Sequence, residues 1–394
     1  MIKEIKSITN LQNQNNKTVN IDNLINIIVE KLKKEILDEP DRILLDLVYK
    51  ENPTQEDLDN CLNNYDIEVV GAHKALMLAY FMKMHPELKF SKYAEPRLKG
   101  LIQYFRFNNL KLISSFTKIC RELNKHNIND IMILKGGAMK HLRPEFPRVM
   151  GDVDILVREA DYEKAVSIAQ NMGYDIDQYV HSTDLHLKGS EEGLLDIHRY
   201  IYLKTGYEKP ICNDFFNRAS KQKVFGLDIL VPCAEDMVFI SLVNLNKNLI
   251  RKTSSAGILY TLFDCGFLIN SKKDFDWNIV IDNVEKTKTK YQMYLAVNFV
   301  NSIVPNFLPN NIIKERLLNK EIEDHFALLF FKRFYLKEMK AHSHALKVGD
   351  AIKSLSLFRE YMSFKPKYFI CKRKAVKKNL YLVKKILKLE KILV

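Results

Sequence analysis

Helical spacing dominates the first third of the chain. Between residues 21 and 128, apolar side chains recur at intervals of three and four, as expected for helices with one buried face. Thr54 follows a proline and precedes an acidic turn, which is typical of a helix start. Four aromatic residues share the helical spacing, so we expect their rings to lie in the core: Tyr104, Phe105, Phe107 and Phe116.

Short apolar, β-branched runs replace this spacing between residues 129 and 232, and they predict strands. The runs are Ile131–Lys135, Asp152–Val157, Tyr174–Val180, Asp184–Lys188, Leu194–Tyr200 and Lys223–Val231, the last a hairpin broken at Gly226-Leu227-Asp228. We expect helices at Ala138–Leu142 and Asp161–Met172, with Gly173 ending the second. The fold class predicted is therefore α+β, with a small mixed β-sheet flanked by helical regions.

Helical spacing returns after Pro232. The predicted helices are 234–245, 254–269 and 284–304, and residues 253–257 form a loop that could lie over a functional site. These changes divide the chain into five segments: a polar, loosely ordered N-terminus at 1–20, an N-terminal helical region at 21–128, the α+β core at 129–232, a C-terminal helical domain at 233–364 and a basic amphipathic tail at 365–394.

Three aspartates end or interrupt apolar runs of the core. Asp152 and Asp154 alternate with apolar residues, so both carboxylates should project from the same face of a strand. Adjacent carboxylates repel each other unless a cation lies between them, and such oxygen ligands suit Mg²⁺. Asp196 follows a third apolar run, where an unpaired buried carboxylate would be costly. We favour a site for two metal ions over the alternative of surface carboxylates on an edge strand.

Candidate phosphate contacts precede these carboxylates. Gly136 and Gly137 lack side chains at a strand-to-helix turn, so backbone N–H groups there could approach phosphate oxygens. Lys135 and Arg148 are candidate cations for a triphosphate, although either could equally be a surface charge or pair with Asp152.

Several histidines are weaker candidates for residues of the functional site. His198 shares a strand face with Asp196 and could orient an acceptor or act as a base, although a structural role is as plausible. His181 and His186 lie on the preceding runs and carry less weight, and we expect the sequence His342-Ser343-His344 to form a solvated loop.

These motifs resemble a known family. Leu-Lys-Gly-Gly at 134–137, Arg-x-x-Gly-Asp-Val-Asp-Ile-Leu-Val at 148–157, Gly173-Tyr174 and Leu-Asp-Ile-His at 195–198 are similar to the bacterial uncharacterised nucleotidyltransferase family, within the DNA polymerase β-like superfamily. Many superfamily members have Gly-Ser where this chain has Gly136-Gly137, so a serine contact to phosphate is absent here.

The resemblance implies Mg²⁺-dependent transfer of a nucleoside monophosphate from an NTP to an acceptor hydroxyl or phosphate, with release of pyrophosphate. By analogy, Asp152 and Asp154 would hold two Mg²⁺ ions, and Asp196 would complete the catalytic site. Two alternatives stay open. One is a transferase using a nucleoside diphosphate-sugar at the same metal site, and the other is a catalytically weak module that binds a membrane or RNA through its tail.

Composition narrows the class of protein and its expected location. The chain is 47% hydrophobic and 28% charged, as in soluble globular proteins, and no apolar run is long enough to span a bilayer. Without a signal-peptide core at the N-terminus, we expect a cytoplasmic protein. Six cysteines lie far apart without a Cys-x-x-Cys pair, which argues against a disulfide framework or a zinc site.

Charge is uneven along the chain. Its net value is +13, and from residue 365 onward eleven Lys or Arg face one Glu. The tail could dock on its own domain, bind an anionic membrane surface such as the inner membrane face, or contact nucleic acid. Contact with nucleic acid is the least favoured of the three, because the tail has few aromatic residues on which bases could stack.

Overall fold

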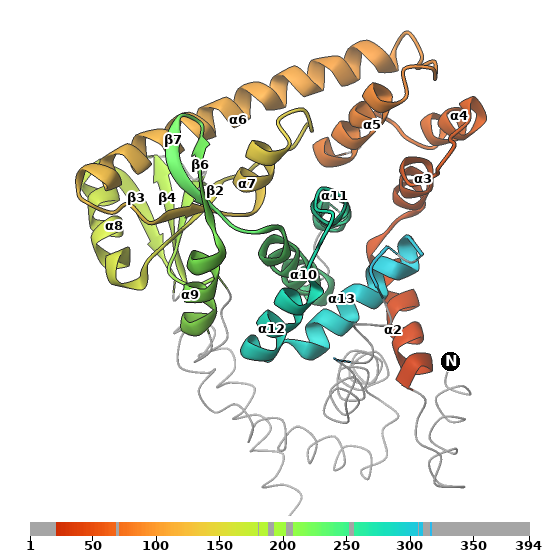
Figure 1. Ribbon diagram of the computed structural model, residues 1–394. Coiled ribbons are helices and arrows are strands. Elements are labelled where there is room, and N and C mark those ends of the chain that lie inside the picture. Colours follow the sequence, from red (N-terminus) through yellow and green to blue (C-terminus); the bar gives the residue numbers. More distant parts are fainter. Residues whose placement is uncertain are drawn as a thin grey trace, which may run out of the picture. The chain divides into compact units, whose positions relative to one another are not determined.

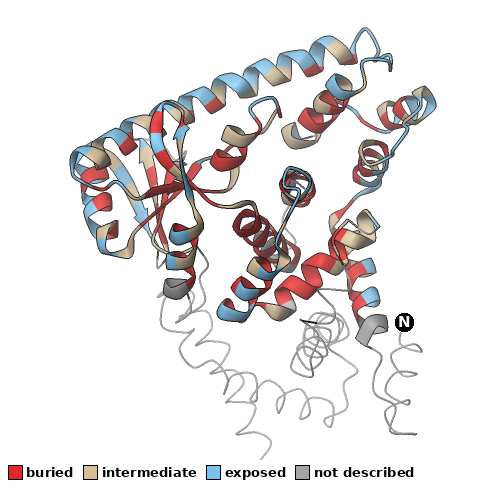
Figure 2. Ribbon diagram, viewed as in Figure 1, coloured by how far each residue is buried: buried red, intermediate tan, exposed pale blue. Residues whose placement is uncertain are grey.

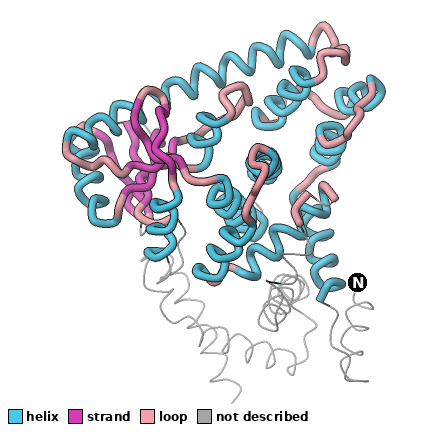
Figure 3. The backbone as a smooth tube through the Cα atoms, viewed as in Figure 1, coloured by secondary structure: helices cyan, strands magenta, loops and turns pink. Residues whose placement is uncertain are grey.

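The computed structural model consists of a mixed β-sheet and many helices, only some of which pack on the sheet (Figures 1 and 3). It describes residues 21–67, 71–179, 181–187, 193–201, 208–251, 256–305, 307–309 and 316. The chain divides into two units, 1–327 and 328–394, and the second unit lies outside the described residues. The same holds for the N-terminus 1–20, the tail 365–394, the sequence His342-Ser343-His344 and most of the loop 253–257. The five predicted segment boundaries stay predictions.

Seven strands form the sheet, which confirms the predicted α+β class. They are β1 (Ile131–Ile133), β2 (Val153–Val157), β3 (Tyr174–Gln178), β4 (Ser182–Leu187), β5 (Gly193–His198), β6 (Ser220–Val224) and β7 (Leu227–Val231). Their order is β3-β4-β5-β2-β1-β7-β6, with β2 parallel to β5 and antiparallel to β1. All five residues of β2 are buried, as its apolar sequence requires of a central strand covered on both faces.

Helix α6 (Ala94–Lys125) is a single helix of 32 residues that contacts β2, β5 and β7, together with α8 (Glu159–Asn171) and α5 (Ala72–Met84). Phe116 packs in the core as predicted, but Tyr104 and Phe107 are 59% and 58% exposed, so that prediction was wrong for both. The buried residues of α6 are concentrated in its C-terminal half, whereas its N-terminal half is largely exposed (Figure 2).

Two other helical regions complete the described fold. The first contains α2 (Ile21–Ile36), α3 (Glu39–Val48), α4 (Gln55–Asn63) and α5. The second contains α10 (Ala234–Arg251), α11 (Ala256–Asn270), α12 (Trp277–Thr287) and α13 (Lys290–Ile303). Thr54 caps α4 in a reciprocal capping box with Asp57, which confirms the predicted start. The predicted helix 284–304 is instead two helices, because Lys288 adopts a left-handed conformation, with φ 51°, at the end of α12.

A buried polar cluster joins the second helical region to α9 (Glu208–Arg218). Arg218, at the end of α9, donates to both oxygens of Asp236 at 2.6 and 3.0 Å and to Asn283 at 3.0 Å. Because Asp236 and Asn283 are fully buried, the paired guanidinium offsets the cost of placing a carboxylate there. Within the described ranges, no helix is both long enough and apolar enough to cross a membrane.

Candidate active site

Strand register brings together aspartates that are far apart in the sequence. Asp154 on β2 is directly opposite Asp196 on β5, and Asp184 on β4 is opposite Asp196 from the other side. Asp177 on β3 is in turn opposite Asp184. Because paired residues of neighbouring strands project from the same face, four carboxylates form one row across the sheet. Their exposure rises along this row, since Asp154 and Asp196 are buried, Asp184 is partly buried and Asp177 is exposed.

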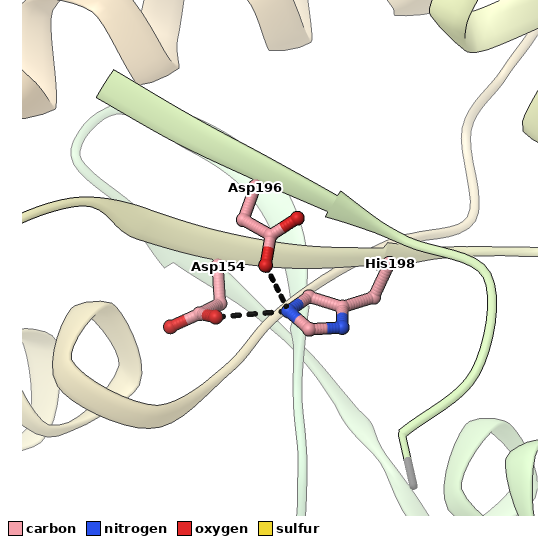
Figure 4. Close-up of side chains that lie close together, drawn as sticks. All are labelled: Asp154, Asp196 and His198. Carbon is pink, nitrogen blue, oxygen red and sulfur yellow. Dashed lines mark hydrogen bonds and ion pairs between the residues drawn. The ribbon is translucent and has the colours of Figure 1, made fainter. Parts of the chain in front are cut away.

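His198 lies between the two buried carboxylates (Figure 4). Its Nε2 is 2.9 Å from Asp154 Oδ1 and 2.9 Å from Asp196 Oδ2, and its side chain is 4% exposed. Burial and the nearby Lys135 charge lower the pKa of His198, but hydrogen bonds to the two carboxylates outweigh them and raise it above its ordinary value. The two carboxylates therefore favour the protonated form of His198.

Lys135 supplies the second positive charge. Its Nζ forms an ion pair with Asp154 Oδ1 and lies 3.5 Å from His198 Nε2. Although burial opposes it, the charge of Asp154 raises the pKa of Lys135, and the two cations in turn lower the pKa of Asp154. The Lys135 backbone has φ 44°, a left-handed conformation that is strained for a residue other than glycine. The fold thus holds this ammonium beside Asp154 at some conformational cost.

Asp152 lies just outside this pair, before the first residue of β2, and is exposed. Although the residue as a whole is exposed, neighbouring groups shield its carboxylate from water, and this desolvation together with the charge of Asp154 raises the pKa of Asp152 to about 6. It faces the cluster closely enough that its charge contributes to the raised pKa of Lys135. The structure therefore brings the three predicted carboxylates into one electrostatic group, with Asp152 at its solvent side.

The donor atoms of the central cluster fit a divalent cation. One atom each from Asp154, Asp196 and His198 lie within 4.8 Å of one another. Asp196 Oδ1 is buried and has no hydrogen-bond partner among the residues that the structure describes. Two carboxylates that need cations, one of them with an oxygen left unpaired, form a donor set that suits an oxygen-preferring ion such as Mg²⁺.

Both glycines belong to the first turn of α7 (Lys135–Leu142), so the expectation that the helix begins at Ala138 was wrong. A Cβ on Gly137 would lie 2.8 Å from Ile133 Cδ1 and 3.0 Å from Val153 Cγ1. Gly137 therefore allows the helix to pack closely on β1 and β2. A Cβ on Gly136 would meet the Arg148 guanidinium, with Nε at 3.3 Å. Because α7 starts here, the N–H groups of this turn lack helical acceptors.

Arg148 forms an ion pair with Asp264 of α11. Its Nη1 is 2.5 and 2.7 Å from the oxygens of Asp264 on α11, and its guanidinium stacks on Tyr260, 4.4 Å from the ring centre. The carbonyl oxygen of Arg148 accepts from Asn109 of α6, and the N–H of the next residue donates to the Tyr260 hydroxyl. Arg148 thus connects the core to α6 and α11, and its predicted contact with phosphate would require the ion pair with Asp264 to open.

Asp184 is the site residue that reading the sequence missed. Burial and the adjacent Asp196 raise the pKa of Asp184 to about 6, so the two carboxyl groups interact directly. Its segment alternates Asp184, Leu185 and His186, the pattern of a half-buried strand, but only the pairing of β4 with β5 reveals its neighbour. His186 lies 3.3 Å from Asp177, and the His181 ring is centred 6.0 Å from that of His198.

The sequence profile of the family described as uncharacterised nucleotidyltransferase matches residues 71–305, more than half of the chain. The protein belongs to this family. It is therefore a nucleotidyltransferase, an enzyme that transfers a nucleoside monophosphate from a nucleotide to an acceptor, as the motifs predicted. The match extends from α5 to the end of α13, so it includes the whole sheet and the second helical region, whereas α2, α3 and α4 lie outside it.

Solved structures of ANT(2″)-Ia are distantly similar. Its crystal structure in complex with adenylyl-2″-tobramycin has a TM-score of 0.34 and 12% sequence identity, covering 45% of this chain and 98% of that one. The solution structure of the same antibiotic-resistance factor has the same TM-score and identity, covering 47% and 94%. No protein of curated function matches the chain.

Proposed function

We propose that the enzyme uses Mg²⁺ to transfer a nucleoside monophosphate from an NTP to an acceptor hydroxyl or phosphate, releasing pyrophosphate. The observation that carries this proposal is the pairing of Asp154 with Asp196 on adjacent parallel strands, with Lys135 and the first turn of α7 beside them. Carboxylates next to unpaired helix N–H groups offer what a metal-bound triphosphate requires.

The carboxylates would hold the metal. Asp154 and Asp196 provide buried oxygens, and Asp152 provides a third carboxylate from the solvent side. When bound, Mg²⁺ supplies positive charge to the phosphate oxygens of the transferring group. Asp196 would also accept the proton of an acceptor hydroxyl, and its Oδ1, which has no hydrogen-bond partner in the described part of the chain, supports this proposal.

Lys135 and the turn that follows it would bind the phosphates. Asp154 would hold the metal in place of the Lys135 ammonium, which would then be free to bind a phosphate oxygen, so the buried carboxylate would keep a cation beside it. The N–H groups of Gly136 and Gly137 would add hydrogen bonds to the same phosphates. His198 would keep the carboxylates of Asp154 and Asp196 oriented.

Replacing Asp154 by asparagine tests this assignment. The Asp154→Asn variant keeps the size of the side chain but removes the charge, and we expect transfer to fall by at least about a thousandfold while the folded state is retained. The assay follows label from each α-labelled NTP into acceptors of a cell extract, together with pyrophosphate release. Asp228→Asn on β7 is the matched control, because Asp228 is exposed and pairs with Lys223. Undiminished transfer in Asp154→Asn would contradict the assignment.

A further inference from the structure

A cavity of about 460 Å³ lies apart from the carboxylates. Its walls come from α5, α6, the end of α7, the loop at 144–148 and the turn between β6 and β7. None of the four aspartates in the cross-strand row lines it. The volume is within the range of small-molecule sites, which is roughly 300–1,000 Å³.

Three cations from three different helices converge on this cavity: Lys83 of α5, Arg106 of α6 and Lys140 of α7. Lys83 and Arg106 are exposed and make no ion pair or hydrogen bond within the described part of the chain. Lys140 is partly buried, and its Nζ donates to the carbonyl oxygen of Pro144 at 2.7 Å. Because their side chains come from separate elements, their convergence is a property of the fold and not of a charged run in the sequence.

Acidic groups do not balance these charges. Glu145 is the one carboxylate in the lining, and it lies 3.4 Å from Arg143 Nε. A fourth lining cation, Arg148, is already paired with Asp264. Burial lowers the pKa of Lys140, Glu145 opposes this, and the charges of Arg106 and Lys83 lower it further. Like charges gathered in this way repel each other, and a bound anion would relieve that repulsion.

The remaining wall is apolar and partly aromatic. Phe105 and Ile113 of α6 line one side and Phe225 another. Phe225 has φ 49° and Gly226 has φ 84° in the two-residue turn between β6 and β7. Asn-Gly is the sequence that adopts this type of turn at low cost, whereas a bulky side chain is strained there. The fold nevertheless places a phenyl ring at this point, where it forms part of the cavity wall.

We propose that this cavity is a second ligand site, which binds a small organic anion consisting of a phosphate or carboxylate group on a planar apolar body. The anionic group contacts Lys83, Arg106 and Lys140, and the planar body lies against Phe105 and Phe225. The inference goes beyond the transfer reaction proposed above, because it does not require the metal or the carboxylates.

Calorimetric titration of the full-length protein with 1-naphthyl phosphate tests this site. We expect one molecule to bind per chain, and we expect 1-naphthol and inorganic phosphate each to bind at least about tenfold more weakly, because each lacks one half of the ligand. Arg106→Gln should weaken binding about tenfold, whereas Lys118→Gln, which removes an exposed cation of the same helix that does not line the cavity, should leave it unchanged.

Two further variants separate this site from the catalytic one. Phe225→Asn removes the ring but suits the turn, so it should fold normally and bind the probe more weakly. Asp154→Asn should bind it as the unaltered protein does. Equal binding by Arg106→Gln, loss of binding in Asp154→Asn, or displacement of the probe by Mg·ATP would overturn the proposal of a separate site.

Discussion

Replacing Lys135 by methionine removes the ammonium that neutralises Asp154 and leaves a side chain of similar length. If the Lys135 ammonium and a bound metal ion both need the Asp154 carboxylate, the two cations compete for it. A divalent ion on Asp154 would lie on the order of 5 Å from the ammonium, and at an effective dielectric constant of about 20 their repulsion is roughly 7 kcal/mol. The lysine side chain can swing away and avoid most of this repulsion. The variant should therefore bind the metal alone about tenfold more tightly.

Nucleotide binding should change in the opposite direction. If Lys135 moves to a phosphate when the metal arrives, Lys135→Met loses one charge-assisted hydrogen bond, and its affinity for the metal–NTP complex should fall about tenfold. Titration of Mn²⁺ followed by electron paramagnetic resonance, with and without a non-hydrolysable NTP, measures both affinities without turnover. Lys118→Met is the matched control, because Lys118 is exposed on α6 and forms no ion pair in the described ranges.

Two results would refute the reasoning. Unchanged or weaker Mn²⁺ affinity in Lys135→Met, measured without nucleotide, would show that the ammonium does not compete with the metal. Equal loss of NTP affinity in Lys118→Met would show that the effect is one of general charge. Either result leaves the role of Asp154 to be judged by its own variant.

Two further predictions concern the residues around this pair. Gly137→Ala should lower the free energy of unfolding by about 1–3 kcal/mol, because its Cβ would overlap Ile133. Gly136→Ala should instead keep the free energy of unfolding within about 0.5 kcal/mol and raise the KM for NTP. Urea unfolding and steady-state kinetics measure these effects, and equal destabilisation by the two variants would contradict the packing argument. Asp184→Asn should stabilise the metal-free protein by about 1 kcal/mol at pH 8 but not at pH 3. A carboxyl group whose folded-state pKa is raised to about 6 costs stability when it is ionised, and it costs almost nothing at pH 3, where it is mostly protonated in both the folded and the unfolded state. An equal gain in the free energy of unfolding at the two pH values would contradict this reasoning.

Local pattern predicted most of the sheet. The alternation of apolar residues located β2 and β5, and the hairpin of β6 and β7 was expected, although its turn is at Phe225-Gly226 and its first strand begins three residues earlier, at Ser220. The start of α7 was missed because consecutive glycines disfavour a helix, and here close packing on β1 and β2 overrides that preference. The break at Lys288 has no glycine or proline to announce it.

Long-range pairing explains what could not be predicted at the site. Asp264 lies 116 residues after Arg148, and no local pattern marks it as the partner that engages this guanidinium. Asp184 is partly buried in a polar strand, and its relation to Asp196 depends on register between β4 and β5. The sequence therefore identified the charged residues of the site, but the partner of each charge depends on tertiary structure.

Helix α7 shows how one short element can serve two sites of opposite charge. Its first residue, Lys135, reaches the buried carboxylates, whereas Lys140 near its other end reaches the cationic cavity. Between them, Gly137 fixes the helix against Val153 of β2, the strand that carries Asp154. Because the packing at Gly137 is tight, a ligand that moved Lys140 could not shift the helix without disturbing Asp154. Binding in the cavity should therefore leave metal affinity unchanged, and a changed metal affinity would show that α7 moves despite this packing.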